Sequence, residues 1–303
     1  MMRSVVTGLD GSPESLSAAD WAAREAISRG LPLRLIHAWE WQPYNYDTRG
    51  SLAGADETRH WAERIPREAS AALRRRYPQL PITADQVDGP AVPTLLAAGA
   101  EAELLVLGSR GLGALADFLI GSVALEVVAA ASRPVVLLRG GEPAEDEQRH
   151  AEGARPSKPS DSRDVVLGLD LERPADAVIA FALDAASRRT ATLRVVHSWY
   201  PPAIYGYAPV GVPADLGVEL AADAADALTQ TLLPWREKFP DTEVIADVRM
   251  GSPAPVLVEA ASDASLLVVG RRIRSSSIGS HIGSVTHAAI HHARAPIAVV
   301  PHD

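Results

Sequence analysis

The sequence predicts two tandem α/β domains, each a doubly wound, Rossmann-like fold with a five-stranded parallel sheet and helices on both faces. Three observations predict this fold class. The chain has 303 residues, enough for two domains of ordinary size. Its first half repeats in its second half. Within each half, short apolar runs alternate with longer segments of helical period, which is typical of βαβ units.

An internal repeat relates the two halves. The segment Val5–Asp10 (VVTGLD) recurs as Val165–Asp170 (VVLGLD), 160 residues later. Further along, Gly121-Ser122 matches Gly283-Ser284 at an offset of 162. A shift of only two residues predicts a duplicated domain with nearly identical element lengths.

The repeat places domains at 1–140 and 163–303. Between them, 141–162 consists mostly of Gly, Pro, Ser and charged residues, with almost no apolar side chain. Such a segment buries too little surface to offset the entropy of ordering, so it is predicted to be a flexible linker.

The elements of the first domain follow from its hydrophobic pattern. Strands are predicted at the short leucine-rich or β-branched runs near 4–9, 33–38, 82–87, 104–108 and 135–139. Helices are predicted near 13–29, 55–76, 91–101 and 121–132. The first of them starts at Ser12-Pro13, a pair typical of a helix N-terminus. The run at 104–108 is apolar almost throughout, as expected for a parallel sheet covered on both faces.

Composition excludes several classes of protein. A hydrophobic share of 47% excludes disorder for most of the chain, and the absence of cysteine excludes disulfide scaffolds, thiolate zinc sites and cysteine nucleophiles. A net charge of −9 argues against a nucleic-acid binder. No apolar run approaches the ~20 residues that cross a bilayer. Since Met1–Ser4 leads directly into a strand-like run, we expect no secretory signal, no membrane partner and a cytoplasmic location.

A glycine-rich segment at the end of the fourth predicted strand is the candidate functional motif. It reads Gly108-Ser109-Arg110-Gly111-Leu112-Gly113, and Gly121-Ser122 opens the next helix. Glycines let a backbone approach a ligand closely, and amides at a helix N-terminus bind anions. Asp10 and Ala38 stand at the ends of the first and second strands, at the same edge of the sheet. Each feature also has a purely structural interpretation, as a turn glycine or as part of a helix cap.

Other sites are disfavoured by the sequence. A P-loop motif is absent, and the glycine cluster follows the fourth strand, whereas a dinucleotide-binding fingerprint follows the first. No serine nucleophile elbow is present. His287 and His291 stand four apart on a predicted helix, but no third metal ligand is evident, so a packed or surface pair is favoured. His37 and His197 are each expected to bond a backbone group.

These motifs resemble those of the universal stress proteins in their tandem two-domain form. The resemblance covers 2–139 and 163–301 and rests on Gly8–Ser12, His37-Ala38, Gly89–Pro93 and the spacing Gly108-x2-Gly111-x9-Gly121-Ser122. It implies an adenine-nucleotide alpha-hydrolase-like fold. That spacing is the signature of the family's ATP-binding branch, so the resemblance implies ATP as ligand, with Mg²⁺ on its phosphates and no metal site of the protein's own.

The resemblance also implies two sets of nucleotide-binding residues and no catalytic ones. The first-half set is Gly8, Asp10, Ala38, Leu107, Gly108, Arg110, Gly111, Gly121, Ser122 and Val123. The second-half set, expected to bind more weakly, is Asp170, Ser198, Gly270, Arg272, Gly283, Ser284 and Val285. Family members dimerise through their last strands, here 135–139 and 297–301, which implies pairing of the two halves within the chain and leaves a homodimer possible.

The second half departs from the motif at two places. Leu171-Glu172 replaces Gly11-Ser12, and Ile273 replaces Gly111. If the loop needs positive φ at Ile273, strain of roughly 1–3 kcal/mol follows. Nearby arginines can offset part of this, but asymmetric sites are expected.

Three functions remain open. The leading one is an ATP-binding stress or signalling module that changes shape or partners with its nucleotide. Because neither glycine loop contains a lysine and no base for activating water is evident, any hydrolysis is expected to be slow. The alternatives are an ATPase or nucleotidyl transferase of the same fold, and an interaction scaffold without nucleotide.

Overall fold

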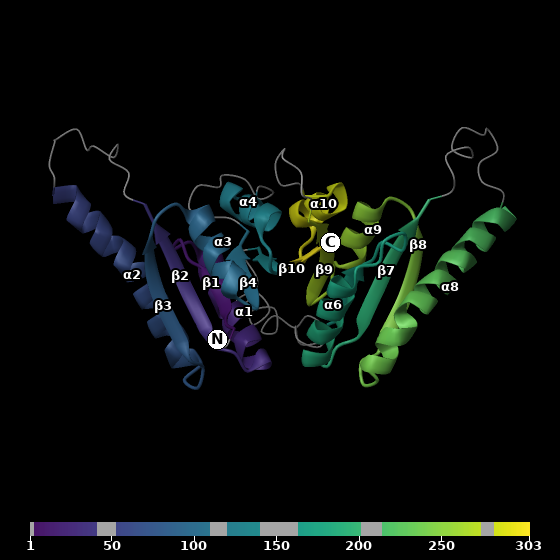
Figure 1. Cartoon of the computed structure of the whole chain (residues 1–303), viewed down its shortest axis with the longest axis horizontal. Helices are drawn as coiled ribbons and strands as arrows, with labels where there is room; N and C mark the ends of the chain where they lie inside the picture. Colours follow the sequence, from purple (N-terminus) through teal and green to yellow (C-terminus); the bar gives the residue numbers. More distant parts are fainter. Residues whose placement is uncertain (1–2, 41–52, 110–119, 140–162, 201–213, 274–281) are drawn as a thin grey trace, which may run out of the picture. The chain divides into compact units, whose positions relative to one another are not determined.

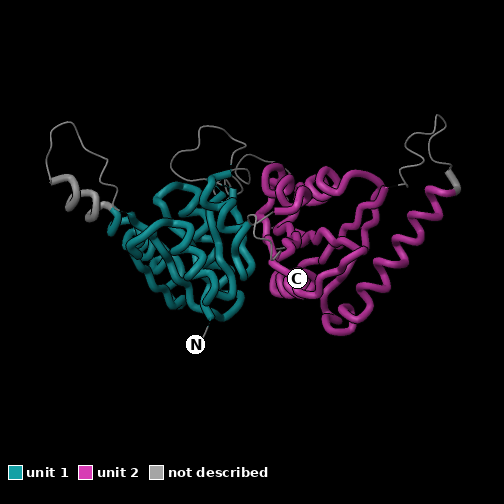
Figure 2. Tube along the Cα trace, turned by 45° about the horizontal axis from the view of Figure 1, so that its top comes forward, with its two compact units in different colours: residues 1–155 teal, residues 156–303 magenta. Residues whose placement is uncertain are grey.

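A computed structural model of the chain describes residues 3–40, 53–109, 120–139, 163–200, 214–273 and 282–303. The chain divides into two compact units, Met1–Arg155 and Pro156–Asp303, shown in teal and magenta in Figure 2. The predicted linker, 141–162, lies outside the described residues. Among the described helices, none is both long and apolar enough to cross a membrane.

The first unit is a parallel sheet with the strand order β3-β2-β1-β4-β5 (Figure 1). Its strands are β1 Val5–Gly8, β2 Leu33–Trp39, β3 Ile82–Asp88, β4 Leu104–Gly108 and β5 Val135–Leu138. Its helices are α1 Pro13–Arg29, α2 Ala53–Arg76, α3 Ala91–Glu101 and α4 Ser122–Ala130. The chain runs outward from β1 to β3 on one side and then from β4 to β5 on the other. The strand order therefore reverses between β1 and β4, where an open sheet leaves a crevice for ligands.

The second unit repeats this order as β10-β9-β6-β7-β8, again with parallel neighbours. Its strands are β6 Val165–Gly168, β7 Leu193–Trp199, β8 Val244–Met250, β9 Leu266–Arg272 and β10 Ile297–His302. Its helices are α6 Asp176–Arg188, α8 Ala214–Lys238, α9 Pro253–Ala260 and α10 Ser284–His292.

The core of each unit lies on both sides of its sheet. Four successive residues of β4, Leu104–Leu107, are buried, as are Leu266–Val269 of β9. Successive side chains of a strand point to opposite faces, so both faces of each sheet are covered. In the first unit α1 contacts α2, and α3 contacts α4; in the second unit α9 contacts α10. The predicted fold class, with parallel strands and helices on both faces, is confirmed.

Element lengths agree between the units, as predicted, for most matched pairs: β1 and β6, β2 and β7, β3 and β8, α4 and α10, and, within one residue, α2 and α8. Helix α6, however, has 13 residues where α1 has 17, and α9 has eight where α3 has 11. Strand β9 has seven residues against five in β4, and β10 has six against four in β5. The later start of α6 and the longer β9 and β10 concern the carboxyl edge of the sheet, where the ligand crevice is expected.

Capping explains the different starts of α1 and α6. Ser12 is the N-cap of α1: its hydroxyl accepts a hydrogen bond from the amide of Ser15 at 3.2 Å, and Asp10 Oδ1 accepts from the Ser12 amide at 2.9 Å. In the second unit Glu172 occupies the position of Ser12, and α6 begins only at Asp176 with no side-chain cap. The second unit therefore lacks the first turn of this helix.

Replacing the cap is expected to loosen the start of α1. Ser12→Ala removes the acceptor for the Ser15 amide, at a cost of about 1 kcal/mol. Hydrogen exchange followed by mass spectrometry checks this, because peptides from the start of α1 should exchange faster. Glu172→Ala, at the matching position without a cap, is the control and should leave exchange in α6 unchanged. Equal protection of α1 in the wild type and Ser12→Ala would contradict the assignment.

Candidate functional site

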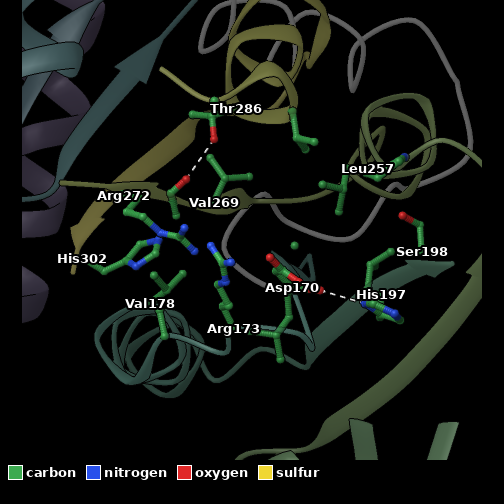
Figure 3. A pocket seen from close by; sticks show the side chains of 18 of the residues that line it. Asp170, Arg173, Val178, His197, Ser198, Leu257, Val269, Arg272, Thr286 and His302 are labelled. Atoms are coloured by element: carbon green, nitrogen blue, oxygen red, sulfur yellow. Dashed lines mark hydrogen bonds between the residues drawn. The ribbon is translucent and has the colours of Figure 1, made fainter. Parts of the chain in front are cut away.

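A cavity of about 610 Å³ opens at the carboxyl edge of the second unit's sheet (Figure 3). It lies where β6, β7 and β9 end and α10 begins, which is the point of strand-order reversal. Its volume falls within the range of small-molecule sites. The cavity is therefore the candidate ligand site of this unit.

All seven residues predicted for the second-half site line this cavity. They are Asp170, Ser198, Gly270, Arg272, Gly283, Ser284 and Val285. Three strand ends and one helix start supply them, although they span more than a hundred positions of the sequence. The topology thus brings together the residues that the sequence motif selected.

The first unit places its described site residues at the matching positions. Gly8 ends β1, and Asp10 follows two residues later; Ala38 lies one residue before the end of β2, which continues to Trp39. Leu107 and Gly108 end β4, Gly121 is the N-cap of α4, and Ser122 and Val123 begin that helix. Arg110 and Gly111 lie outside the described residues.

The glycines at the starts of α4 and α10 require no unusual backbone. Gly121 has φ −63° and ψ 144°, and Gly283 has φ −60° and ψ 151°, an extended conformation that any residue adopts. A Cβ added at Gly283 would meet none of the described atoms within 4 Å. Among the described residues, neither backbone strain nor packing explains a glycine at Gly283, and a serine there would cap the helix better. What the glycine does provide is open access to the helix N-terminus from the cavity.

Other site glycines are explained by packing. A Cβ at Gly108 would stand 2.9 Å from the carbonyl carbon of Glu14 and 3.0 Å from the Ser15 nitrogen, so glycine lets β4 approach α1. At Gly8 a Cβ would meet Leu107 and Leu95 at 2.8 and 2.9 Å. Close packing of neighbouring elements therefore accounts for glycine at these two positions.

The first turn of each helix supplies hydrogen-bond donors. The amides at the start of an α-helix have no acceptor within the helix, and its dipole favours an anion there. In the first unit the Gly121 amide donates to Ser109 O at 2.8 Å, which ties α4 to the end of β4. The amides of Ser122 and Val123, and of Ser284 and Val285 in α10, follow these glycines. Each unit thus presents amide donors at the start of this helix, which is the chemistry that an anion needs.

The loop after the strand differs between the units. In the second unit β9 and β10 stay paired through Arg272 and His302, and the Ile273 amide donates to His302 O at 2.6 Å. Ile273 stands where the first unit has Gly111. Its φ is not positive, since Thr190 is the only described non-glycine residue with positive φ. The backbone strain expected if Ile273 had a positive φ is therefore absent. Instead, the Ile273 amide forms a hydrogen bond within the sheet and is not available to a ligand.

Two histidines form hydrogen bonds to the backbone directly after β1 and β6. His37 Nδ1 lies 2.7 Å from Leu9 O, and His197 Nδ1 lies 3.0 Å from Leu169 O. Because a carbonyl only accepts, Nδ1 is the donor in both rings. The prediction that each histidine bonds a backbone group is confirmed.

Sequence reasoning missed three residues that also line the cavity: Arg173, Thr286 and His302. The Thr286 hydroxyl donates to Gly270 O at 2.9 Å and ties α10 to β9. The sequence did not point to Arg173 because the alignment of the halves places it opposite Pro13, inside a predicted helix. It did not point to His302 because this residue lies beyond the predicted last strand.

Charge at the edge of the cavity is mostly positive. Among the described lining residues, Arg173 and Arg272 stand with a single carboxylate, Asp170. Arg271, next in the strand, is 6% exposed, and burial lowers the pKa of its guanidinium below the usual value.

His287 and His291 contact each other, with ring centroids 4.5 Å apart and the ring planes tilted by 42°. Within the described residues no group of three or more His, Cys, Asp or Glu is placed to hold a metal.

Comparison with known proteins identifies the fold's family. The model of the universal stress protein family matches the chain twice, at residues 1–139 and 162–301. The chain belongs to the universal stress protein family. It is of the tandem type, because each structural unit contains one match.

Relatives match this universal stress protein over nearly its whole length. It is 33% identical to Universal stress protein Rv2005c of Mycobacterium tuberculosis, over 97% of this chain and 96% of the relative. Universal stress protein Rv1996 of the same organism is 30% identical, over 99% of this chain and 96% of the relative. The crystal structure of a universal stress protein from Archaeoglobus fulgidus covers 99% of this chain and 98% of its own, with a TM-score of 0.67 at 16% identity, a likeness of fold.

Proposed function

We propose that this universal stress protein binds adenine nucleotide at the carboxyl edge of its sheets, with ATP in the first unit, as a nucleotide-dependent stress-response or signalling module. The observation that carries the proposal is the glycine at the start of α10, which keeps a helix N-terminus open to a cavity although neither its backbone nor packing against the described residues requires it. The same three residues, Gly-Ser-Val, begin α4 at Gly121 and α10 at Gly283.

The chemistry of the site suits a phosphorylated nucleoside. Helix amides and the Ser122 hydroxyl can donate to phosphate oxygens, and Arg110 adds a guanidinium in the sequence of the first loop. Asp10 uses Oδ1 to brace Ser12, which leaves its other carboxylate oxygen as an acceptor for a ribose or base group. Mg²⁺ would come with the nucleotide, held by its phosphates.

The first unit is the better candidate for a triphosphate. Its loop contains Gly111, whereas the matching Ile273 amide already donates to His302 O. A phosphate chain needs several amide donors, and the Ile273 amide is not available as one. Tight binding of ATP in the first unit and weak binding in the second follow from this difference.

The test is a titration of the full chain with ATP and Mg²⁺. At a free concentration one hundred times Kd, binding stabilises the folded state by about 2.7 kcal/mol, so the thermal midpoint rises by several degrees. Calorimetry should give one tight site per chain. An unmoved midpoint, or two equal sites, would contradict the proposal.

Phosphate release in the same solutions separates a binder from an enzyme. Because the chain has no lysine in either glycine loop, we expect turnover below about one per minute. Faster release would favour the alternative, an ATPase or nucleotidyl transferase of the same fold. Binding of no nucleotide would favour an interaction scaffold.

A further inference from the structure

The second unit's cavity has a basic side that the first unit's sequence lacks. Arg173, Arg272 and His302 line the cavity. The residues at the matching positions of the first half are Pro13, Arg110 and Gly140, so two of the three basic side chains occur only in the second half.

The missing helix turn makes room for Arg173. In the first unit the start of α1 fills this space, since a Cβ at Gly108 would meet Glu14 and Ser15 backbone atoms. In the second unit α6 begins only at Asp176, and Arg173 points from the preceding loop into the cavity (Figure 3). A Cβ at Gly270 would meet side chains instead: His302 Nε2 at 2.8 Å and Val178 Cγ2 at 3.2 Å.

The longer strands bring in the other two residues. Because β9 and β10 stay paired for two residues past Gly270, Arg272 and His302 are directly opposed neighbours in the ladder. Neighbours in parallel register point to the same face of a sheet. The longer pairing of β9 with β10, which also binds the Ile273 amide, therefore places two basic side chains in the wall of the cavity.

The two arginines of the cavity have no acidic partner among the described residues: neither Arg173 nor Arg272 lies in a salt bridge there, and Asp170 is the only acidic residue of the described lining. Arg272 is half-buried. A cavity with excess positive charge attracts an anionic ligand, and guanidinium groups bind phosphate oxygens in pairs.

The other side of the cavity is of different character. His197, Ser198 and Leu257 lie there in Figure 3, away from Arg272 and His302, and Val196 and Pro253 add apolar surface. A ligand that fills both sides has a largely apolar, ring-like part and one compact anionic group. A nucleoside monophosphate meets this description, whereas the outer phosphates of a triphosphate need further amide donors, and the Ile273 amide already donates to His302 O.

We infer that the second unit's cavity binds a nucleoside monophosphate, whose phosphate lies among Arg173, Arg272 and His302, in preference to a triphosphate. The inference rests on the proposed binding of adenine nucleotide. It makes the second unit a site of changed selectivity rather than a weakened copy of the first.

The experiment is calorimetry on the full chain carrying Gly121→Leu, which closes the first site, with adenosine 5′-monophosphate, adenosine 3′-monophosphate and MgATP as probes. We expect one monophosphate per chain, bound more tightly than ATP, and the better of the two isomers identifies the position of the phosphate. Arg173→Gln and His302→Gln should each weaken that binding roughly tenfold. Arg294→Gln removes an exposed arginine outside the cavity and should change nothing.

The outcomes separate this inference from the proposed function. The inference is overturned if ATP binds this chain more tightly than both monophosphates, or if Arg173→Gln and His302→Gln leave monophosphate affinity unchanged. It is also overturned, with the proposed function intact, if wild type binds ATP but no monophosphate binds once ATP is saturating. Failure of the wild type to bind any of the three nucleotides overturns both. Equal thermal midpoints without ligand show that the variants fold.

Discussion

A chain carrying Gly121→Leu is expected to lose tight ATP binding by roughly a hundredfold or more in Kd, and to keep its fold. Gly121 has an extended backbone that leucine also adopts, so the substitution introduces no backbone strain. Its side chain would cover the amides at the start of α4. Losing two charge-assisted hydrogen bonds of about 1.5–3 kcal/mol each accounts for the size of the effect.

Gly283→Leu is the matched control, because the two glycines cap equivalent helices with nearly the same φ and ψ. Both variants lose the same small contribution of glycine at an N-cap, so their thermal midpoints without nucleotide should fall equally. Calorimetry with MgATP then separates them: Gly283→Leu should retain the tight site. Loss of ATP binding in both variants, or in neither, would count against a tight site in the first unit.

Gly108→Ala is expected to destabilise the first unit by about 1–3 kcal/mol, more than any substitution of a surface residue nearby. The added methyl group would stand 2.9 Å from the Glu14 carbonyl carbon and 3.0 Å from the Ser15 nitrogen. These are backbone atoms of the first turn of α1, which Ser12 holds in place through its cap. The strand and the helix must therefore separate to admit the methyl group.

Gly270→Ala tests the same substitution at the equivalent position of the second unit. There the methyl group would meet the end of the His302 side chain, which can rotate away, and Val178 at 3.2 Å, which has to shift slightly. We expect a clearly smaller loss of stability. Urea unfolding, with hydrogen exchange to assign each transition to a unit, measures both losses. A larger loss for Gly270→Ala than for Gly108→Ala would contradict this account of the packing.

The two pairs of glycines show how far a motif can be interpreted without coordinates. Gly108 and Gly121 belong to one spacing in the sequence, and both were predicted to serve the approach of a ligand. The structure separates them: packing against α1 accounts for Gly108, whereas the equivalent of Gly121 in the second unit faces open space. The spacing of a motif indicates which positions are glycine. Why each position is glycine depends on the atoms that a Cβ would contact there.

The repeat was informative where the two copies agree and misleading where they differ. Matched residues such as Asp170 and Gly283 were placed correctly at one sheet edge because strand order and parallel pairing follow from the alternation of strands and helices. Arg173 was missed because alignment with Pro13 predicts a helical turn that the second unit does not form. The loss of one serine, at the position of Ser12, accounts for that change.

The sequence by itself determined the duplicated α/β fold, the membership of each half in one family and the sheet edge at which the second unit's cavity opens. These follow from local hydrophobic patterns and from glycine spacing, which act over a few residues at a time. Only the tertiary structure decided that the Ile273 amide pairs with His302 and that Arg173, Arg272 and His302 share one cavity. Such contacts join residues from different strands and loops, and whether an amide or a guanidinium is available for a ligand depends on partners that a local pattern does not contain.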